Sequence, residues 1–217
     1  MISNLLKPIS LWMPYLRNMS EQAVFLDRDG TIVKELEFIR YPRQVKILPG
    51  VITALKQLQQ AGYRLIVITN QSCVARGWVT IKELNLVHRH IEQLFQKHGV
   101  FIDKIYYCPH HVEGAIKRYS FKCACRKPAI GMFKQAAREL KVRLKKSFMV
   151  GDARRDIEAG HKIKARSILV LTGQGKKTLK EQRADKKVRP DFIARNLLQA
   201  VPFIIGNPVT KLRMRRI

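Results

Sequence analysis

Short apolar runs alternate with amphipathic helical patterns along most of the chain. Runs of β-branched, aromatic and other apolar residues are typical of buried strands. We expect strands at Ala23–Asp27, Arg64–Thr69, 104–108, Ser147–Asp152, 167–171 and 191–194. Between them, apolar residues recur every three or four positions, as on the buried face of a helix. Helices are expected at about 50–62, 80–98, 129–141 and 196–204, with a short one after Asp152.

The alternation of strands and helices predicts the fold class. Strand–helix–strand units build a parallel sheet with helices on both faces, so we expect an α/β fold. The chain has 217 residues, 46% of them hydrophobic, which is enough to bury one good core. We therefore interpret residues 21–205 as a single domain, and the sequence shows no internal repeat.

The two ends of the chain do not follow this pattern. Residues 1–20 contain prolines and an asparagine that interrupt the apolar run a signal peptide needs. We interpret them as a leader, either disordered or the result of a start assigned too early, with Met19 as the true start. Residues 206–217 form a basic tail that contains "KLRMRR". No apolar run in the sequence approaches the ~18 residues that a membrane span requires.

The balance of charges is the unusual feature of the composition. The formal net charge is +26, from 42 Lys and Arg against 16 Asp and Glu. Such an excess attracts polyanions such as nucleic acid, anionic lipid or phosphorylated substrates. A general drift of the source proteome toward Lys and Arg would produce the same excess, and both explanations stay open. The positive residues are spread out without interleaved aromatic residues, which does not favour a nucleic-acid site.

Polar side chains follow three of the expected strands at the point where each strand ends. Asp27 and Asp29 follow the first strand, Thr69 the second and Asp152 the fourth. In open parallel sheets, ligands bind beyond the carboxyl ends of the strands. A carboxylate in such a place needs a cation or hydrogen-bond donors nearby. For Asp152 taken alone, capping of the following helix is the alternative.

Four short motifs follow one another along the chain: "FLDRDGT", "VITN", "CRKP" and "GDARRD". In this order they resemble the haloacid dehalogenase superfamily, which consists mostly of phosphatases. With "ITNQS", "ARG" and "YYCPHH" the chain more closely resembles the D-glycero-D-manno-heptose 1,7-bisphosphate 7-phosphatases. These enzymes belong to a branch of the superfamily that also includes the histidinol-phosphatase domain. The resemblance covers about residues 23–172. It implies a haloacid dehalogenase-like Rossmannoid parallel sheet with a small inserted loop held by zinc.

The resemblance implies a role for each strand-end carboxylate. Asp27 would be the nucleophile that forms an aspartyl-phosphate, and Asp29 the general acid and base. These two residues share a face of an extended segment, so both can approach one phosphate. Because two anions beside a phosphate need a cation, Mg²⁺ is expected. By analogy it would bind Asp27, the backbone carbonyl of Asp29, and Asp152.

Polar residues of the other motifs are candidate substrate contacts. They are Thr69, Asn70, Gln71, Arg126 and Lys127. By resemblance, Thr69 would donate a hydrogen bond to the transferred phosphoryl group and Lys127 would neutralise its charge. Arg126 is the candidate for a second phosphate or a sugar hydroxyl, since a guanidinium can grip an oxyanion bidentately. Asp156 would orient Lys127 or a metal-bound water.

Three of the four cysteines lie in residues 108–125, together with a histidine pair. Three sulfurs and one nitrogen form the Cys₃His set of a structural zinc site. The candidate ligands are Cys108, His110, Cys123 and Cys125. A disulfide is disfavoured because nothing indicates export, and unrelated free thiols stay open as an alternative. The resemblance favours zinc and implies that His111 is not one of its ligands. It also implies that the zinc holds Arg126 and Lys127 over the phosphate.

Parts of the chain depart from the family pattern. Cys73 stands where the family usually has glycine, and a positive φ at this position would cost a non-glycine residue about 1–2 kcal/mol. No histidine base pairs with Cys73 in this part of the sequence, so we reject a catalytic thiol. Ala153 stands where a lysine usually follows the last Gly-Asp, so a basic contact is lost or moved. The stretch "VKELEFIRYP" replaces a segment that in the family usually contains Gly-Tyr after a polar pair and contacts the sugar, so Glu35, Glu37 and Phe38 are unreliable as substrate contacts.

These features predict a Mg²⁺-dependent phosphatase that hydrolyses the 7-phosphate of D-glycero-D-manno-heptose 1,7-bisphosphate, in carbohydrate metabolism and lipopolysaccharide biosynthesis. The long spacing between His110 and Cys123 favours this substrate over histidinol phosphate. A histidinol-phosphate or other small phosphate-ester phosphatase stays an alternative, as does a nucleic-acid-binding protein or polynucleotide 3′-phosphatase. We expect a cytoplasmic monomer whose partner is a phosphorylated sugar, with Mg²⁺ and structural Zn²⁺ as cofactors.

Overall fold

A computed structural model describes residues 20–184 and 188–206 of the chain. The expected leader and basic tail lie outside the described residues, except for Ser20 and Gly206. Within the described ranges, no helix is long and apolar enough to cross a membrane.

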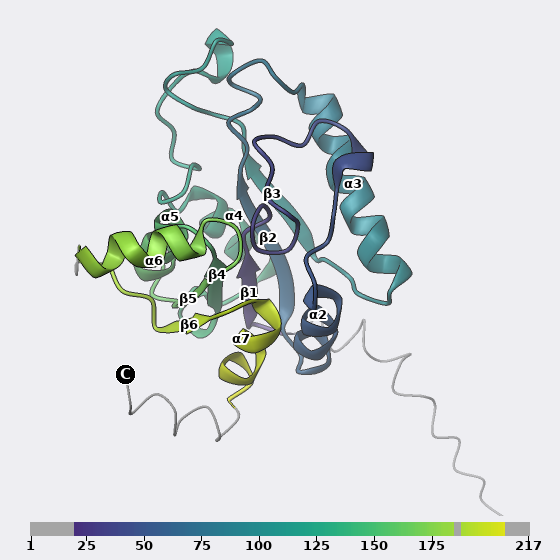
Figure 1. Ribbon diagram of the computed structural model, residues 1–217, viewed down its shortest axis with the longest axis vertical. Coiled ribbons are helices and arrows are strands. Elements are labelled where there is room, and N and C mark those ends of the chain that lie inside the picture. Colours follow the sequence, from purple (N-terminus) through teal and green to yellow (C-terminus); the bar gives the residue numbers. More distant parts are fainter. Residues whose placement is uncertain (1–19, 185–187, 207–217) are drawn as a thin grey trace, which may run out of the picture.

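A six-stranded parallel sheet forms the centre of the molecule (Figure 1). Its strands are β1 (Ala23–Leu26), β2 (Arg64–Asn70), β3 (Lys104–Cys108), β4 (Phe148–Gly151), β5 (Arg166–Val170) and β6 (Phe192–Ala194). The order across the sheet is β3-β2-β1-β4-β5-β6. Because the chain runs outward from β1 to β3 and then crosses to β4, the order reverses beside β1. Ligand crevices in such sheets lie at this point, beyond the carboxyl ends of the strands.

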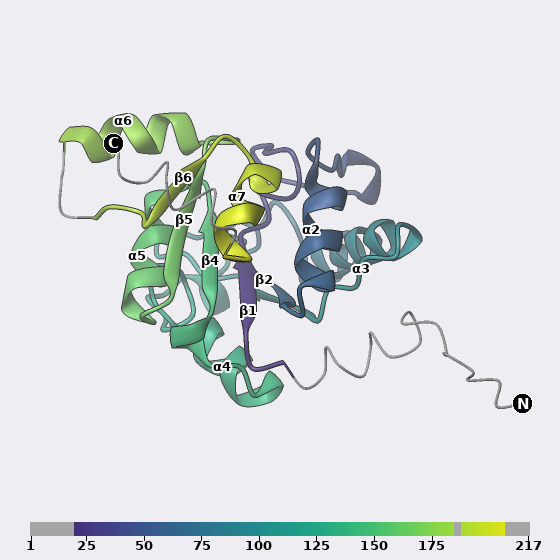
Figure 2. The same cartoon turned by 90° about the horizontal axis from the view of Figure 1, so that it is seen from below.

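Helices cover both faces of the sheet. They are α2 (Val51–Gln60), α3 (Ile81–Lys97), α4 (Gly131–Leu140), α5 (Arg154–Lys162), α6 (Gly175–Ala184) and α7 (Leu197–Ile204), with short 3₁₀ turns η2 (Pro42–Gln44), η3 (Lys117–Tyr119) and η4 (Leu144–Lys146). Figure 2 shows α2 and α3 on one side of the strands and α4 and α5 on the other. The expected α/β class is therefore confirmed.

Alternation along the strands divides the core into two layers. Val24 and Leu26 of β1 pack in one apolar cluster with residues of α2, α3 and α7. Ala23 and Phe25 pack in a second cluster with Met132 and other residues of α4 and α5. Successive strand side chains point to opposite faces, so a strand that is buried on both faces reads as a continuous apolar run. This is why β1 could be located from sequence.

Helix α6 was not expected from the sequence. Its segment, "GKKTLKEQRA", is rich in Lys and lacks the apolar stripe that identifies a helix packed on a core. A polar contact attaches the helix instead: the Thr178 hydroxyl donates to the Asp152 carbonyl at 2.9 Å. Hydrophobic periodicity does not detect an attachment of this kind.

Candidate active site and metal centre

Three predicted site residues meet beyond the carboxyl ends of the two central strands. Asp27 follows β1, and its backbone N–H donates to Val150 of β4 at 2.9 Å. Asp152 follows β4, and Asp156 lies in the first turn of α5. One carboxylate oxygen from each of the three residues lies within 4.8 Å of the others, and all three side chains are buried. The structure therefore concentrates three carboxyl groups at one point of the sheet edge.

Lys127 supplies the nearest positive charge to this cluster. Its Nζ lies 2.7 Å from Asp27 Oδ1 and 2.7 Å from Asp156 Oδ1, and it donates to the Ile68 carbonyl at 2.6 Å. Burial alone lowers the pKa of Lys127, but the Asp156 and Asp27 carboxylates outweigh it and leave the pKa above its ordinary value. Lys127 is therefore a fixed cation beside Asp27.

Asp152 is held in a cradle that only glycine permits. A β-carbon on Gly30 or Gly173, both of which have positive φ, would lie 2.1 Å from Asp152 Oδ2. The same oxygen accepts the Gln174 N–H at 2.7 Å, whereas the buried Oδ1 has no hydrogen-bond partner among the described residues. Burial, with Asp27 and Asp156 nearby, raises the pKa of Asp152 to about 8.

This arrangement fits a divalent cation. An orphaned, buried carboxylate oxygen beside two further carboxylates is costly unless a cation shares the site. Oxygen ligands of this kind suit Mg²⁺. Of the described residues, the predicted ligands Asp27 and Asp152 could hold such an ion, and the side chain of Asp156 belongs to the same cluster.

Asp29 is the exposed member of the predicted catalytic pair. Its side chain is 22% exposed and forms an ion pair with Arg28 at 2.8 Å. Gln71 Nε2 donates to Asp29 Oδ2 and to Thr69 Oγ1, each at 2.8 Å. Because Thr69 Oγ1 accepts this bond, its own proton is free to be donated elsewhere. Gln71 thus links the ends of β1 and β2.

Two residues behind Asp29 were missed by the sequence analysis. Arg28 is 1% exposed, and it donates to Gln71 Oε1 at 2.9 Å and lies 3.0 Å from His88 Nε2. Burial and the nearby Arg28 charge lower the pKa of His88 to about 3. A neutral imidazole can accept from the guanidinium. The position of Arg28 between Asp27 and Asp29 could have marked it as a site residue. The sequence holds no such signal for His88, which has the same spacing as the other residues on the buried face of α3.

Asn70 joins the end of β2 to the segment that carries Lys127. Its Nδ2 donates to the Lys127 carbonyl at 3.0 Å, and its Oδ1 accepts the Lys127 N–H at 2.9 Å. The neighbouring Arg126 donates from Nη1 to the His110 carbonyl at 3.1 Å. Both cationic residues are thus tied to their surroundings through backbone groups.

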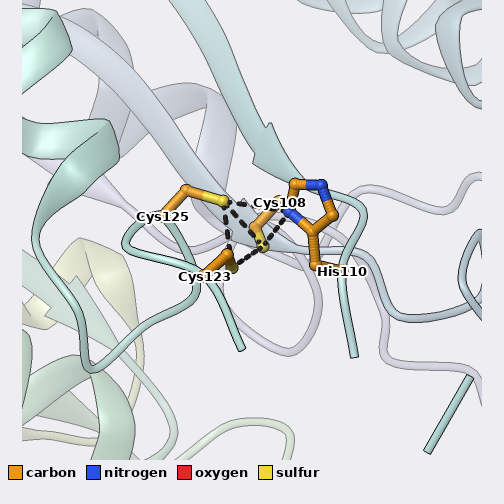
Figure 3. Close-up of side chains that lie close together, drawn as sticks. All are labelled: Cys108, His110, Cys123 and Cys125. Atoms are coloured by element: carbon orange, nitrogen blue, oxygen red, sulfur yellow. Dashed lines mark hydrogen bonds between the residues drawn. The ribbon is translucent and has the colours of Figure 1, made fainter. Parts of the chain in front are cut away.

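The four predicted zinc ligands form one cluster in the cysteine loop (residues 108–125), as Figure 3 shows. Cys125 Sγ lies 3.1 Å from Cys108 Sγ and 3.2 Å from Cys123 Sγ. His110 Nδ1 lies 3.3 Å from Cys125 Sγ and 3.6 Å from Cys108 Sγ. All four cysteines of the chain are free.

The donor set fits a tetrahedral zinc ion. With a Zn–S bond of about 2.3 Å, sulfurs at the corners of a tetrahedron are about 3.8 Å apart; the separations of 3.1 to 3.5 Å observed here are shorter, so the sulfurs would move apart slightly around the ion. His111 lies outside the cluster, and its Nδ1 accepts the Glu113 N–H at 3.2 Å. The donor set therefore matches Cys₃His and not a disulfide.

Comparison with known proteins finds a matching family model and several similar phosphatases. A family model described as HAD-hydrolase-like matches residues 124–200. The D-glycero-β-D-manno-heptose-1,7-bisphosphate 7-phosphatase of Haemophilus ducreyi is 37% identical over 188 residues, which cover 86% of this chain and all of the relative. The chain belongs to this phosphatase family. The corresponding enzyme of Pasteurella multocida is 41% identical over 155 residues, 71% of this chain and 84% of the relative.

The heptose bisphosphatase family also includes similar solved structures. One is a D,D-heptose 1,7-bisphosphate phosphatase from B. bronchiseptica complexed with magnesium and phosphate. It is 31% identical, has a TM-score of 0.74 and covers 86% of this chain and 99% of its own. The enzyme from Burkholderia thailandensis is 29% identical with a TM-score of 0.61, covering 86% and 97% of the two chains. The resemblance inferred from the motifs is confirmed.

The departures from the heptose bisphosphatase pattern have local explanations. Cys73 is not among the described non-glycine residues with positive φ, which are Lys141 and Lys164, so it carries no such strain. It packs in a small apolar cluster with Val74, Val79 and Leu84. Ala153 is the N-cap of α5, and its N–H donates to Asp156 Oδ2 at 3.0 Å. Glu35 accepts a hydrogen bond from the Gln174 side chain.

Proposed function

We propose that this enzyme hydrolyses the 7-phosphate of D-glycero-D-manno-heptose 1,7-bisphosphate through an aspartyl-phosphate on Asp27. The observation that supports this reaction most strongly is the ion pair of Asp27 with Lys127 beside the orphaned oxygen of Asp152. It joins a nucleophile, a cation and a further carboxylate on one buried sheet edge. The substrate is inferred from the similar proteins, which are named as heptose bisphosphate phosphatases.

The first half of the reaction uses both predicted catalytic carboxylates. An Asp27 oxygen attacks phosphorus and forms the aspartyl-phosphate, and the bond from phosphorus to the sugar oxygen breaks. The departing alkoxide takes a proton from the carboxylic acid form of Asp29. The partial exposure of Asp29 places it on the side from which a sugar can approach.

The second half returns the enzyme to its starting state. The ionised Asp29 takes a proton from a water molecule, whose oxygen attacks the phosphorus of the aspartyl-phosphate. The bond between phosphorus and Asp27 breaks, which releases inorganic phosphate and restores the protonated Asp29. Gln71 keeps Asp29 aligned through its 2.8 Å hydrogen bond in both halves.

Charge on the phosphoryl group is stabilised by groups that are already in place. Lys127 contributes a buried ammonium, and Thr69 has a free hydroxyl proton to donate. Asn70 positions Lys127 through its two backbone contacts. Mg²⁺, when bound by Asp27, the Asp29 carbonyl and Asp152, neutralises further negative charge at this centre.

Zinc has a structural role in this proposal. Its four ligands come from the two ends of the cysteine loop, and Cys125 leads directly into Arg126 and Lys127. A closed Cys₃His set has no open position for a substrate. Zinc would therefore hold the loop while Lys127 reaches the phosphate. The free cysteines fit the reducing environment of the cytoplasm, where we expect this enzyme to act as a monomer.

A phosphate-release screen tests the substrate assignment. The purified enzyme is assayed with heptose 1,7-bisphosphate, histidinol phosphate and a 3′-phosphorylated oligonucleotide, with Asp27→Asn as the inactive control. We expect the highest kcat/KM for the heptose bisphosphate. A higher kcat/KM for either of the other substrates would reject the assignment, and phosphate release by Asp27→Asn would reject the mechanism.

A further inference from the structure

Two basic segments lie at the amino ends of the central strands, on the side of the sheet opposite the catalytic carboxylates. They are residues 141–146, which lead into β4, and residues 161–166, which lead into β5. The first segment contains four Lys and Arg and the second contains three, and neither contains Asp or Glu. We call these two segments together the basic face.

The pairing of the strands brings the two segments side by side. β4 and β5 are parallel neighbours with Phe148 opposite Arg166, and Lys146 and Lys164 each lie two residues before this pair. The Arg166 N–H donates to the Ser147 carbonyl at 3.1 Å. The positive charges of both segments therefore share one end of the sheet.

Most charges of the basic face have no counter-charge. Arg143 forms an ion pair with Glu21 at 2.8 Å, and both side chains are exposed. The lysines of the face are also exposed, and none of them forms an ion pair with a described residue: Lys141, Lys145, Lys146, Lys162 and Lys164. Like charges gathered without a counter-charge attract an external anion.

Two of these lysines occupy backbone positions that favour glycine. Lys141 and Lys164 are the described non-glycine residues with positive φ, at 54° and 59°. Each follows a helix, α4 or α5, where a residue in this conformation is usually glycine. A lysine is thus present at both positions although glycine would adopt the backbone more easily. Attraction of the lysines to the carboxyl ends of the two helices is an alternative explanation.

The place of the basic face indicates a partner other than the substrate. The catalytic carboxylates follow the carboxyl ends of β1 and β4, whereas the basic face precedes the amino ends of β4 and β5. An anion bound at the basic face therefore leaves the active site open. Single-stranded nucleic acid is not favoured, because the basic face contains no Phe, Tyr or Trp on which bases could stack.

The chain that enters the domain beside the basic face fits a lipid surface. The Arg143 N–H donates to the Glu21 carbonyl at 2.7 Å, so the segment before β1 lies next to the face. The sequence before it includes Leu5, Trp12 and Tyr15, which are residue types that enter the interface of a bilayer. Basic residues together with such residues hold proteins on anionic membranes.

We propose that the basic face binds the surface of a membrane that contains anionic lipid, with the active site turned toward the solvent. The inference does not depend on the identity of the substrate, because the basic face and the catalytic carboxylates lie at opposite ends of the strands. Each lysine beside an anionic surface strengthens partitioning about fivefold. Because the attraction is electrostatic, salt weakens it.

Cosedimentation of the full chain with lipid vesicles tests this proposal. We expect the wild type to bind vesicles of phosphatidylglycerol and phosphatidylcholine more tightly than vesicles of phosphatidylcholine alone, and salt to release it. If three of the lysines contact the surface, a face variant that lacks all five partitions at least about 100-fold less. This variant carries Lys141→Gly, Lys145→Gln, Lys146→Gln, Lys162→Gln and Lys164→Gly.

A matched control variant separates the basic face from net charge. It removes five exposed lysines from segments that follow the carboxyl ends of the strands: Lys34→Gln, Lys46→Gln, Lys82→Gln, Lys122→Gln and Lys176→Gln. We expect its partitioning to stay within about threefold of the wild type, since these charges lie more than a screening length from the bound surface. An equal loss in both variants would overturn the proposal.

A double variant keeps the test independent of folding. Lys141→Gly with Lys164→Gly relieves the positive φ of both residues, so we expect a thermal unfolding midpoint no lower than that of the wild type. Its partitioning onto the anionic vesicles should still fall by at least about fivefold. Unchanged partitioning of the double variant and of the face variant would mean that the lysines act only on the ends of α4 and α5, and the proposal would be wrong.

A single-stranded RNA oligonucleotide, titrated at the same salt concentrations, identifies the other class of polyanion. We expect the wild type to bind the anionic vesicles and the face variant to lose that binding. Binding of the RNA by the wild type without binding of the vesicles would assign the basic face to nucleic acid. Binding of neither would leave the basic face a solvated surface, and both results contradict the proposal.

Discussion

The strand ends and the cysteine loop hold their side chains in different ways. At the strand ends, Asp27 and Asp152 follow buried apolar strands and are fixed by the sheet and by a glycine cradle. The cysteine loop contains one short 3₁₀ turn, and its Val112, Ile116 and Phe121 are exposed. Because the loop has no core of its own, we expect it to need a metal to stay ordered. The comparison shows that the position of Lys127 depends on both regions, because Lys127 follows the cysteine loop in the chain and contacts Asp27 at the strand ends.

The largest expected effect comes from changing the strand-end region alone. Asp27→Asn removes the nucleophile, so we expect kcat to fall by at least about 1000-fold. The cysteine loop is not involved, so zinc content measured by atomic emission should stay at one ion per chain. Loss of zinc in this variant would show that the two regions are not separate.

Removing a zinc ligand changes the loop alone. In Cys123→Ser we expect zinc to be lost and kcat/KM to fall by about 100-fold, because displacement of a positioning group by about 1 Å has this effect. The exposed Lys117 and Arg118 should then become the first sites of trypsin cleavage. Mass spectrometry of timed digests reads this out, and equally early cleavage within the strands would mean that zinc stabilises the whole fold.

Asn70 is where the two regions meet, so its removal tests their coupling. Asn70→Ala leaves two backbone groups of Lys127 without partners, which costs about 1–3 kcal/mol of unfolding free energy. We also expect about a tenfold lower kcat. Asn196→Ala, which removes the N-cap of α7, is the matched control: about 1 kcal/mol of stability is lost with unchanged activity. Unchanged activity in Asn70→Ala would disprove the coupling.

The smallest effect concerns His88, behind the strand ends. Its pKa is lowered to about 3 by burial and Arg28, below the unfolded value of about 6.5. The unfolded state therefore binds the proton first, and stability falls as pH drops through 6.5. Between pH 7 and 5 the wild type should lose about 2 kcal/mol more than His88→Gln. Urea unfolding at several pH values measures this, and parallel curves would contradict it.

Sequence patterns predicted the parts of the site that follow strong backbone signals. Asp27, Asp29 and Asp152 come directly after apolar strands, so the sheet alone brings them to one edge. The zinc ligands were found from residue chemistry and spacing. The catalytic roles of the aspartates and the metal-binding roles of both groups stay predictions, although the structure brings the residues of each group together.

Other parts depend on contacts that no local pattern records. Helix α6 is attached through Thr178 and not through an apolar stripe. His88 differs from a core residue only by touching Arg28, which comes from another element. The lysines of the basic face are among 42 Lys and Arg in the sequence, and only the pairing of β4 with β5 brings its two segments together. Such features emerge when distant segments pack together.

Phosphorus NMR of the reaction mixture tests the central claim most directly. Heptose 1,7-bisphosphate has two distinct phosphorus resonances, and inorganic phosphate adds a third as the reaction proceeds. The proposed function predicts that the resonance of the 7-phosphate disappears while that of the 1-phosphate remains. Loss of the 1-phosphate first, or of both at the same rate, would contradict it.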